Sequence, residues 1–175
     1  MGDVTGMTVQ TPAMPRTPNQ IAALPVRLHA EGFVEVLLVT SRETGRWIIP
    51  QGWLAPGLAP HEAAAKEAME EAGVVGAIAP EPIGHFDYDK RLDSGVVLPC
   101  QVAVYLLRVE RQLDRWREKG RRDHEWVTSR EAARRVCNLS LQRLIARIGR
   151  SPELASPTPL RAVRNRRSPS SLSVA

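Results

Sequence analysis

Hydrophobic residues recur along this 175-residue chain with more than one period, which predicts both strands and helices. Two apolar segments, residues 21–29 and 33–40, flank a turn at Glu31-Gly32 and predict a pair of strands. The second segment is apolar on both of its faces, so we expect it to lie inside a sheet. Residues 96–109 have the same two-sided character and predict a long central strand.

The second half of the chain adds helices to this sheet. Further short strands are predicted at residues 47–49, 75–79 and 84–88. A capping-box pattern at residues 128–131 starts one helix. Apolar residues spaced i, i+3, i+4, i+7 between Leu141 and Ile148 mark a final amphipathic helix. Strands, one embedded helix, more strands and then helices indicate an α/β (α+β) fold, with a mixed sheet and helices on both faces.

The embedded helix carries the most informative chemistry. Pro60 suits its first turn and Gly73 suits the left-handed residue that ends it. Glu67, Glu70 and Glu71 fall within an arc of about 100° on this helix and repel one another. A divalent cation such as Mg²⁺ or Mn²⁺ relieves that repulsion, because it prefers hard oxygen ligands. The alternative for an isolated E-x-x-E-E pattern is a solvated acidic face.

Residues 52–74, GWLAPGLAPHEAAAKEAMEEAGV, resemble the Nudix box. That box reads Gly, five residues, Glu, seven residues, Arg-Glu, an aliphatic residue, any residue, Glu-Glu, any residue, Gly and an aliphatic residue. The positions that match at the right separations are Gly52, Glu67, Glu70, Glu71, Gly73 and Val74. The departures are Leu58 in place of the first Glu, Lys66 in place of Arg, and Ala68 in place of a larger aliphatic residue.

The resemblance extends over roughly residues 20 to 148. The run RWIIPQGW at 46–53 resembles the entry into the Nudix loop. The stretches at 40–42, 86–91 and 125–126 are similar to a branch that includes diphosphoinositol polyphosphate and diadenosine polyphosphate hydrolases. The resemblance implies an α/β/α sandwich with a mixed sheet. It also implies metal-dependent hydrolysis of a pyrophosphate bond in a nucleoside diphosphate linked to a moiety X, or in a polyphosphorylated substrate.

Carried over by position, the resemblance assigns roles to several residues. Glu67, Glu70 and Glu71 would be the ligands of Mg²⁺ (or Mn²⁺), and one of them or a distal Glu would activate the attacking water. Glu125, which precedes Trp126 on a predicted strand, is a candidate for an extra catalytic carboxylate; the alternative is a surface Glu in a charged patch. Lys66 and Gly73 would support the site. The candidates for substrate binding are Arg27, Arg46, Gln51, Gly52, Lys90 and Arg91.

The two departures in the box leave a second function open. Lys66 keeps the positive charge of Arg but loses its bidentate fork, and Leu58 removes a carboxylate that often pairs with that Arg. These changes either compensate for each other or weaken catalysis. The alternative is therefore a binding or regulatory protein on a Nudix scaffold. The retained E-x-x-E-E favours the enzyme, because a lost site has no reason to keep repelling carboxylates.

Composition divides the chain into one folded domain and two tails. Residues 1–20 are expected to be a disordered leader, 21–149 the Nudix domain and 150–175 a disordered basic tail. Residues 151–175 carry four Arg against one Glu, so +3 of the formal net charge of +5 lies in the tail. No nucleic-acid-binding motif is visible, so no specific nucleic-acid binding is expected; the open alternative is that the tail anchors the domain to RNA or acidic partners.

Cellular setting and substrate are less well determined. No apolar run approaches the roughly 20 residues that a membrane helix requires, so no membrane association is expected. Two widely separated cysteines favour a cytoplasmic protein over a secreted one. The family resemblance implies that its partner is a phosphorylated small molecule. Inositol pyrophosphates, dinucleoside polyphosphates, ADP-ribose and nucleoside triphosphates all fit the chemistry, and the first two are favoured. Oligomeric state is left open.

Overall fold

A computed structural model of the chain describes residues 19–92 and 94–155. Its strands are β1 (Gln20–Leu28), β2 (Val34–Thr40), β3 (Trp47–Ile48), β4 (Gln51–Trp53), β5 (Val74–Ile78), β6 (Gly84–Arg91), β7 (Val97–Gln112) and β8 (His124–Thr128). Its helices are α1 (Pro60–Ala72), α2 (Ser129–Arg135) and α3 (Leu139–Gly149), followed by the 3-10 helix η1 (Pro152–Ala155).

The strands form one mixed sheet. Its main path runs β3-β2-β1-β7-β5, with β4 on β1, β6 on β7 and β8 on β2. The central strands β1 and β7 are parallel, whereas β1 and β2 are antiparallel. Both strands that we expected inside the sheet, β2 and β7, have neighbours on two sides. Side chains of both strands are buried in the core on each face of the sheet, which explains why both of their faces are apolar.

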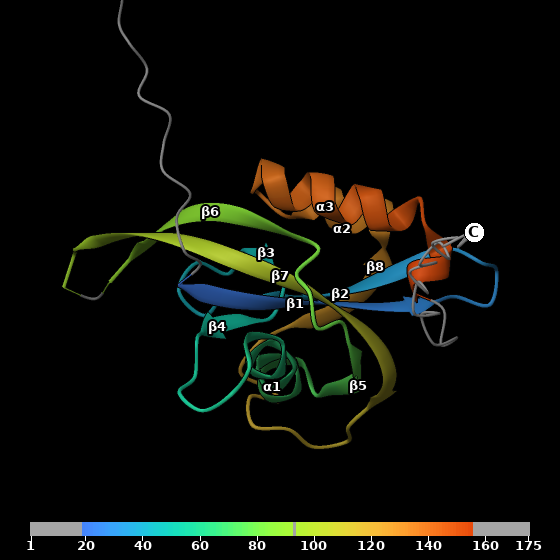
Figure 1. Cartoon of the computed structure of the whole chain (residues 1–175), viewed down its shortest axis with the longest axis horizontal. Helices are drawn as coiled ribbons and strands as arrows, with labels where there is room; N and C mark the ends of the chain where they lie inside the picture. The colour runs from blue at the N-terminus through green and yellow to red at the C-terminus, as the bar shows by residue number, and fades with distance from the viewer. Residues whose placement is uncertain (1–18, 93, 156–175) are drawn as a thin grey trace, which may run out of the picture.

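The sheet separates two layers of helix, as Figure 1 shows with α1 on one face and α2 and α3 on the other. Side chains alternate along β1, so Ala22 and Leu24 pack toward α2 and α3 while Ile21 and Ala23 pack toward α1. All four are fully buried. The predicted sandwich with a mixed sheet is confirmed.

Helix α1 begins and ends as its sequence predicts. Pro60 occupies the first turn, and Gly73 caps the C-terminus with φ 68°. The Glu62 carboxylate accepts a hydrogen bond of 2.9 Å from the Ala59 N–H, which satisfies a donor at the N-terminus. Small residues on the buried face let the helix approach the sheet closely. Met69 lies outside that face and is 39% exposed.

Two boundaries differ from the sequence expectation. Residues 51–53, expected in a loop, form β4 because their backbone pairs with the start of β1. Residues 152–155, expected in the tail, form η1, and Ala155 is buried against the core. The expected leader and the rest of the tail lie outside the described residues. Within those residues, no helix is long and apolar enough to cross a membrane.

Candidate active site

The three predicted glutamates lie in the C-terminal half of α1, where the helix disfavours them. The C-terminal end of a helix carries partial negative charge, and the last turn of α1 holds no basic residue. The Glu71 side chain is only 6% exposed, and Glu67 and Glu70 are partly buried. Burial and the helix dipole both oppose the charge of these carboxylates, so they need cations close by.

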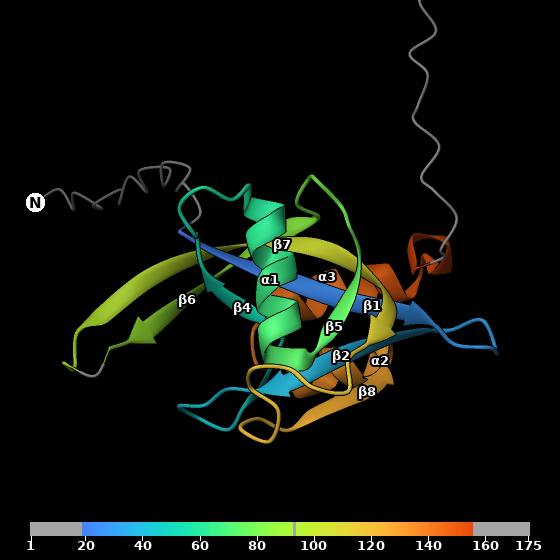
Figure 2. The ribbon, with the colours of Figure 1, turned by 90° about the horizontal axis from the view of Figure 1, so that it is seen from below.

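The loop between β7 and β8, residues 113–123, closes over the end of α1; we call it the capping loop (Figure 2). The Leu113 N–H donates to the Gly73 carbonyl at 2.7 Å, and the Glu118 N–H donates to the Glu70 carbonyl at 3.1 Å. These bonds satisfy carbonyls that the helix end leaves open. The Trp116 ring lies against Gly73, where any Cβ would collide with it.

The capping loop brings a fourth carboxylate and a buried arginine to the cluster. The side chains of Arg122 and Glu118 are 6% and 12% exposed. The Arg122 guanidinium donates to the Glu71 carboxylate and, at 2.5 Å, to Glu118. It also donates to the Thr40 carbonyl at the end of β2, at 2.9 Å. We refer to Glu67, Glu70, Glu71 and Glu118 as the carboxylate cluster.

The site residues predicted from the sequence include neither Glu118 nor Arg122. They lie in a stretch where acidic and basic residues alternate, which is the usual composition of a solvated loop. The only available signal is their four-residue separation, and that spacing has no special meaning outside a helix. Their position depends on how the capping loop folds back onto α1, which is a tertiary contact.

The four carboxylates differ in their electrostatic surroundings. Burial raises the pKa of Glu71 to about 7, although Arg122 and the Gln51 N–H lower it. Desolvation, and then the nearby charge of Glu70, raises the pKa of Glu67. Hydrogen bonds from Lys66 and Arg117 hold the pKa of Glu70 below its usual value. Both of those cations lie 2.8 Å from Glu70.

Glu67 is the carboxylate of the cluster that no cation holds. It has no ion-pair partner in the described part of the chain, whereas Glu70, Glu71 and Glu118 each have at least one. Its carboxyl group lies against β4 at Gly52, where a Cβ would overlap it. The neighbouring Gln51 N–H donates to Glu71 at 3.2 Å. Strand β4 therefore binds Glu71 through a backbone N–H and packs against Glu67 at Gly52.

This donor set suits a hard divalent cation. Four carboxylates supply oxygen ligands, and one of them, Glu67, is half-buried and makes no ion pair in the described residues. Among residues 19–92 and 94–155, no three potential ligands converge on one point. The carboxylate oxygens do not converge because three of the four carboxylates, Glu70, Glu71 and Glu118, are paired with Lys or Arg side chains. The residue types fit Mg²⁺ or Mn²⁺, and binding requires those oxygens to turn toward the ion.

Several predicted substrate-binding residues lie beside β4. The Gln51 side chain lies near the Tyr88 hydroxyl, which donates to the Gln20 side chain at 2.6 Å. The Lys90 ammonium lies 5.6 Å from the centre of the Trp53 ring and 3.7 Å from Glu43. Arg46, before β3, and Arg91, at the end of β6, are exposed. Gln51 and Gly52 thus lie on the strand that touches the carboxylates, and Lys90 lies beside that strand.

Glu125 and Arg27 lie elsewhere. Glu125 pairs in register with Leu38, whose side chain faces α2 and α3, so Glu125 faces away from α1. Its carboxylate accepts a hydrogen bond of 2.5 Å from Arg135 on α2. The Arg27 guanidinium pairs with Glu35 at 2.6 Å and lies over the Trp126 ring. The structure brings neither residue to the carboxylate cluster.

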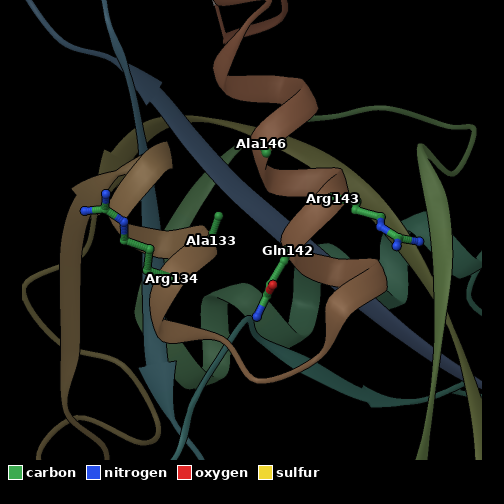
Figure 3. A pocket seen from close by; sticks show the side chains of 5 residues that line it. All are labelled: Ala133, Arg134, Gln142, Arg143 and Ala146. Atoms are coloured by element: carbon green, nitrogen blue, oxygen red, sulfur yellow. The ribbon is translucent and has the colours of Figure 1, made fainter.

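A shallow groove on the opposite face is separate from this site. Ala133, Arg134, Gln142, Arg143 and Ala146 line it, between α2 and α3 (Figure 3). Those helices lie across the sheet from α1. The groove contains no carboxylate, so it offers none of the metal-binding chemistry of the cluster.

Comparison with known proteins agrees with this geometry. The family model of the NUDIX domain matches residues 18–147, and the chain belongs to the Nudix family. It is 30% identical over 102 residues to Nudix hydrolase 12, mitochondrial, of Arabidopsis thaliana, covering 57% of this chain and 50% of that protein. It is 36% identical over 101 residues to diphosphoinositol polyphosphate phosphohydrolase 2 of Rattus norvegicus, covering 56% and 52%.

The chain spans about half the length of these curated relatives. Among solved structures, the binary complex of the C. elegans Ap4A hydrolase matches with a TM-score of 0.56. That match covers 75% of this chain and 95% of the other. At 19% identity it shows the shared fold alone.

Proposed function

We propose that the protein hydrolyses a pyrophosphate bond in a polyphosphorylated small molecule, with Mg²⁺ or Mn²⁺ held by the carboxylate cluster. The observation that carries this proposal is Glu67, a half-buried carboxylate without an ion-pair partner in the described residues. Burying such a charge is costly unless a cation compensates for it. Membership of the Nudix family supports the same chemistry.

The residues of the cluster would divide the work. Glu67, Glu70, Glu71 and Glu118 would hold the ion, which when bound polarises phosphate oxygens and lowers the pKa of water. Glu67 and Glu71 are the candidates to accept a proton from the attacking water, because burial raises the pKa of both. A proton acceptor works best when its pKa lies near the working pH, as that of Glu71 does.

The cations predicted from the sequence would bind the phosphate groups, and of these Lys90 lies beside β4. Lys90 is close to Trp53, and the exposed Arg46 and Arg91 carry guanidinium forks that suit phosphate. The Trp53 ring is 43% exposed and offers a flat surface to a ring of the substrate. We favour substrates of the diphosphoinositol polyphosphate or diadenosine polyphosphate type. The name of the rat relative supports the first of these.

Release of phosphate or nucleotide from a panel of pyrophosphate compounds tests the proposal. The wild type is compared with Glu70→Gln and Glu71→Gln in Mg²⁺ and in Mn²⁺, with Glu81→Gln as the control, since Glu81 is exposed and remote from the cluster. We expect turnover on at least one compound, a loss of about 100-fold or more in the first two variants, and no loss in the control. Equal turnover in all four proteins would contradict the proposal.

The second candidate is a Nudix protein that binds a ligand without cleaving it. It is favoured by one observation: Lys66, Arg117 and Arg122 already neutralise three carboxylates of the cluster. This candidate predicts saturable binding of a panel compound, no turnover in either metal, and binding unchanged by Glu70→Gln. Isothermal titration of the same panel separates it from the hydrolase.

A further inference from the structure

We propose that Arg122 is the internal counter-ion of the carboxylate cluster and the residue that positions Glu71 against Glu118. It supplies from the capping loop the guanidinium fork that Lys66 lacks in the box. The inference rests on the proposed function only in taking the cluster as a metal site. Arg122 is a positioning residue in this account, since it acts through the carboxylates.

Burial and bonding of Arg122 support this role. Its side chain and that of Glu71 are each 6% exposed, so neither charge is solvated. The guanidinium donates to Glu71, to Glu118 and to the Thr40 carbonyl, which uses three directions of a planar group. A lysine ammonium is a point charge and cannot hold two carboxylates and a carbonyl in one plane. This one fork therefore links Glu71 to Glu118, in addition to the Gln51 N–H that binds Glu71 and the Arg42 guanidinium that pairs with Glu118.

Lys66 performs a different task. Its side chain is 44% exposed, and its ammonium pairs with Glu70 one helical turn away. That pair lies on the outer side of the cluster, whereas Glu71 is buried against β4. Lys66 thus neutralises Glu70 and leaves the buried carboxylate to Arg122. The change from Arg to Lys in the box is compensated by a residue 56 positions later in the chain.

The backbone of the capping loop fixes the position of Arg122. Next to it, the Asp123 N–H donates to the Thr40 hydroxyl at 3.0 Å, and the Thr40 N–H donates to the Asp123 carbonyl at 3.0 Å. At the other end of the loop, the Trp116 ring rests on Gly73. Because both ends are held, the guanidinium is delivered to the cluster without needing a metal to place it.

A counter-ion role has a consequence that simple packing lacks. Without Arg122, Glu71 would have no ion-pair partner among the described residues and Glu118 would keep only Arg42, 3.6 Å away, which destabilises the metal-free protein. A divalent cation would then supply the missing charge. Metal should therefore raise the melting temperature of an Arg122 variant by more than it raises that of the wild type.

Melting temperatures in EDTA and in saturating MnCl₂ test this, for Arg122→Gln, Arg122→Lys and the control Arg121→Gln. Arg121 is an exposed neighbour in the same loop and, in the described residues, its side chain has no ion pair. We expect Arg122→Gln to melt roughly 10 °C lower in EDTA and to recover several degrees more in Mn²⁺ than the wild type does. The melting temperature of Arg122→Lys should lie between those of Arg122→Gln and the wild type, and that of Arg121→Gln should match the wild type.

Two results would overturn the inference: Arg122→Gln matching Arg121→Gln in EDTA, or a lower melting temperature with no extra gain from Mn²⁺. If Arg122→Gln does not fold, Arg122→Lys carries the test, because it retains the charge and loses only the fork. None of these measurements uses a substrate. The protein could show the expected melting temperatures and still turn over no compound of the panel. That result would support the role of Arg122 and contradict the proposed hydrolysis.

Discussion

Two arginine–glutamate ion pairs lie on opposite faces of the sheet, and breaking them should cost very different amounts of stability. On the α1 face, Arg122 and Glu71 are each 6% exposed. On the other face, Arg135 and Glu125 are 27% and 49% exposed. A solvated pair is worth about 1 kcal/mol or less, whereas breaking a buried pair costs about 3–5 kcal/mol. The difference teaches that burial, more than pairing, distinguishes the candidate site from the ordinary surface.

The largest expected effect is on kcat, which should fall when Glu118 is replaced and stay nearly unchanged when Glu125 is replaced. Glu118 lies in the cluster, so Glu118→Gln should lower kcat by about 100-fold. Glu125 faces α2, so Glu125→Gln should leave kcat within about twofold of the wild type. Steady-state kinetics on the panel substrate with Mg²⁺ measures both. A loss in Glu125→Gln equal to that in Glu118→Gln would show that the wrong carboxylate has been assigned.

A second expected effect concerns pH. Burial raises the pKa of Glu71 from 4.5 to about 7, so between these values the folded state holds a proton that the unfolded state has released. Stability therefore falls as pH rises through this window. In EDTA, the free energy of unfolding of wild type relative to Glu71→Gln should fall by on the order of 3 kcal/mol between pH 4.5 and 7.5. Urea titrations at several pH values measure it, and a difference that rises with pH contradicts the burial argument.

Gly52→Ala should lower both stability and activity. The added methyl group would overlap the Glu67 carboxyl group and push it away from β4. We expect a loss of about 1–3 kcal/mol in unfolding free energy, together with at least a tenfold loss of turnover. Chemical denaturation and kinetics on the same sample check both values. Full activity in this variant would mean that the position of Glu67 against β4 is unimportant.

The smallest expected effect is on the solvated pair. Arg135→Gln should change the free energy of unfolding by about 1 kcal/mol or less, because water solvates both charges when the bond is lost. Its response to Mn²⁺ should equal that of the wild type. Differential scanning calorimetry with and without metal measures both. A loss as large as that of Arg122→Gln would remove the contrast between the two faces.

The sequence predicts those parts of the molecule that local physics determines. Pro60, Gly73 and the repeating alanines locate α1 within a residue, and two-sided apolar runs place β2 and β7 inside the sheet. Strand β4 escapes prediction because only three residues pair and their side chains carry no period. Thr128 shows the opposite case, since its hydroxyl accepts the Glu131 N–H as the capping pattern predicts.

Site residues also divide into those that local geometry predicts and those that only tertiary contacts place. The three glutamates of α1 are neighbours through helical geometry, and the structure places them together. Glu118 and Arg122 join them only because the capping loop folds back onto Gly73 and Thr40. Glu125 was expected near the cluster from its place in the chain. The alternation of β8 turns it to the other face, and sequence cannot fix the register of a short strand against β2.

The most direct test of the central claim compares the wild type with Glu67→Gln. It measures binding of Mn²⁺ to each metal-free protein and then turnover of the panel substrate. The account predicts saturable binding and metal-dependent turnover in the wild type. It predicts binding weakened about tenfold or more and turnover lost in Glu67→Gln, because the carboxylate without a counter-ion is gone. Equal binding and equal turnover in the two proteins would contradict the assignment of the carboxylate cluster as a metal-dependent active site.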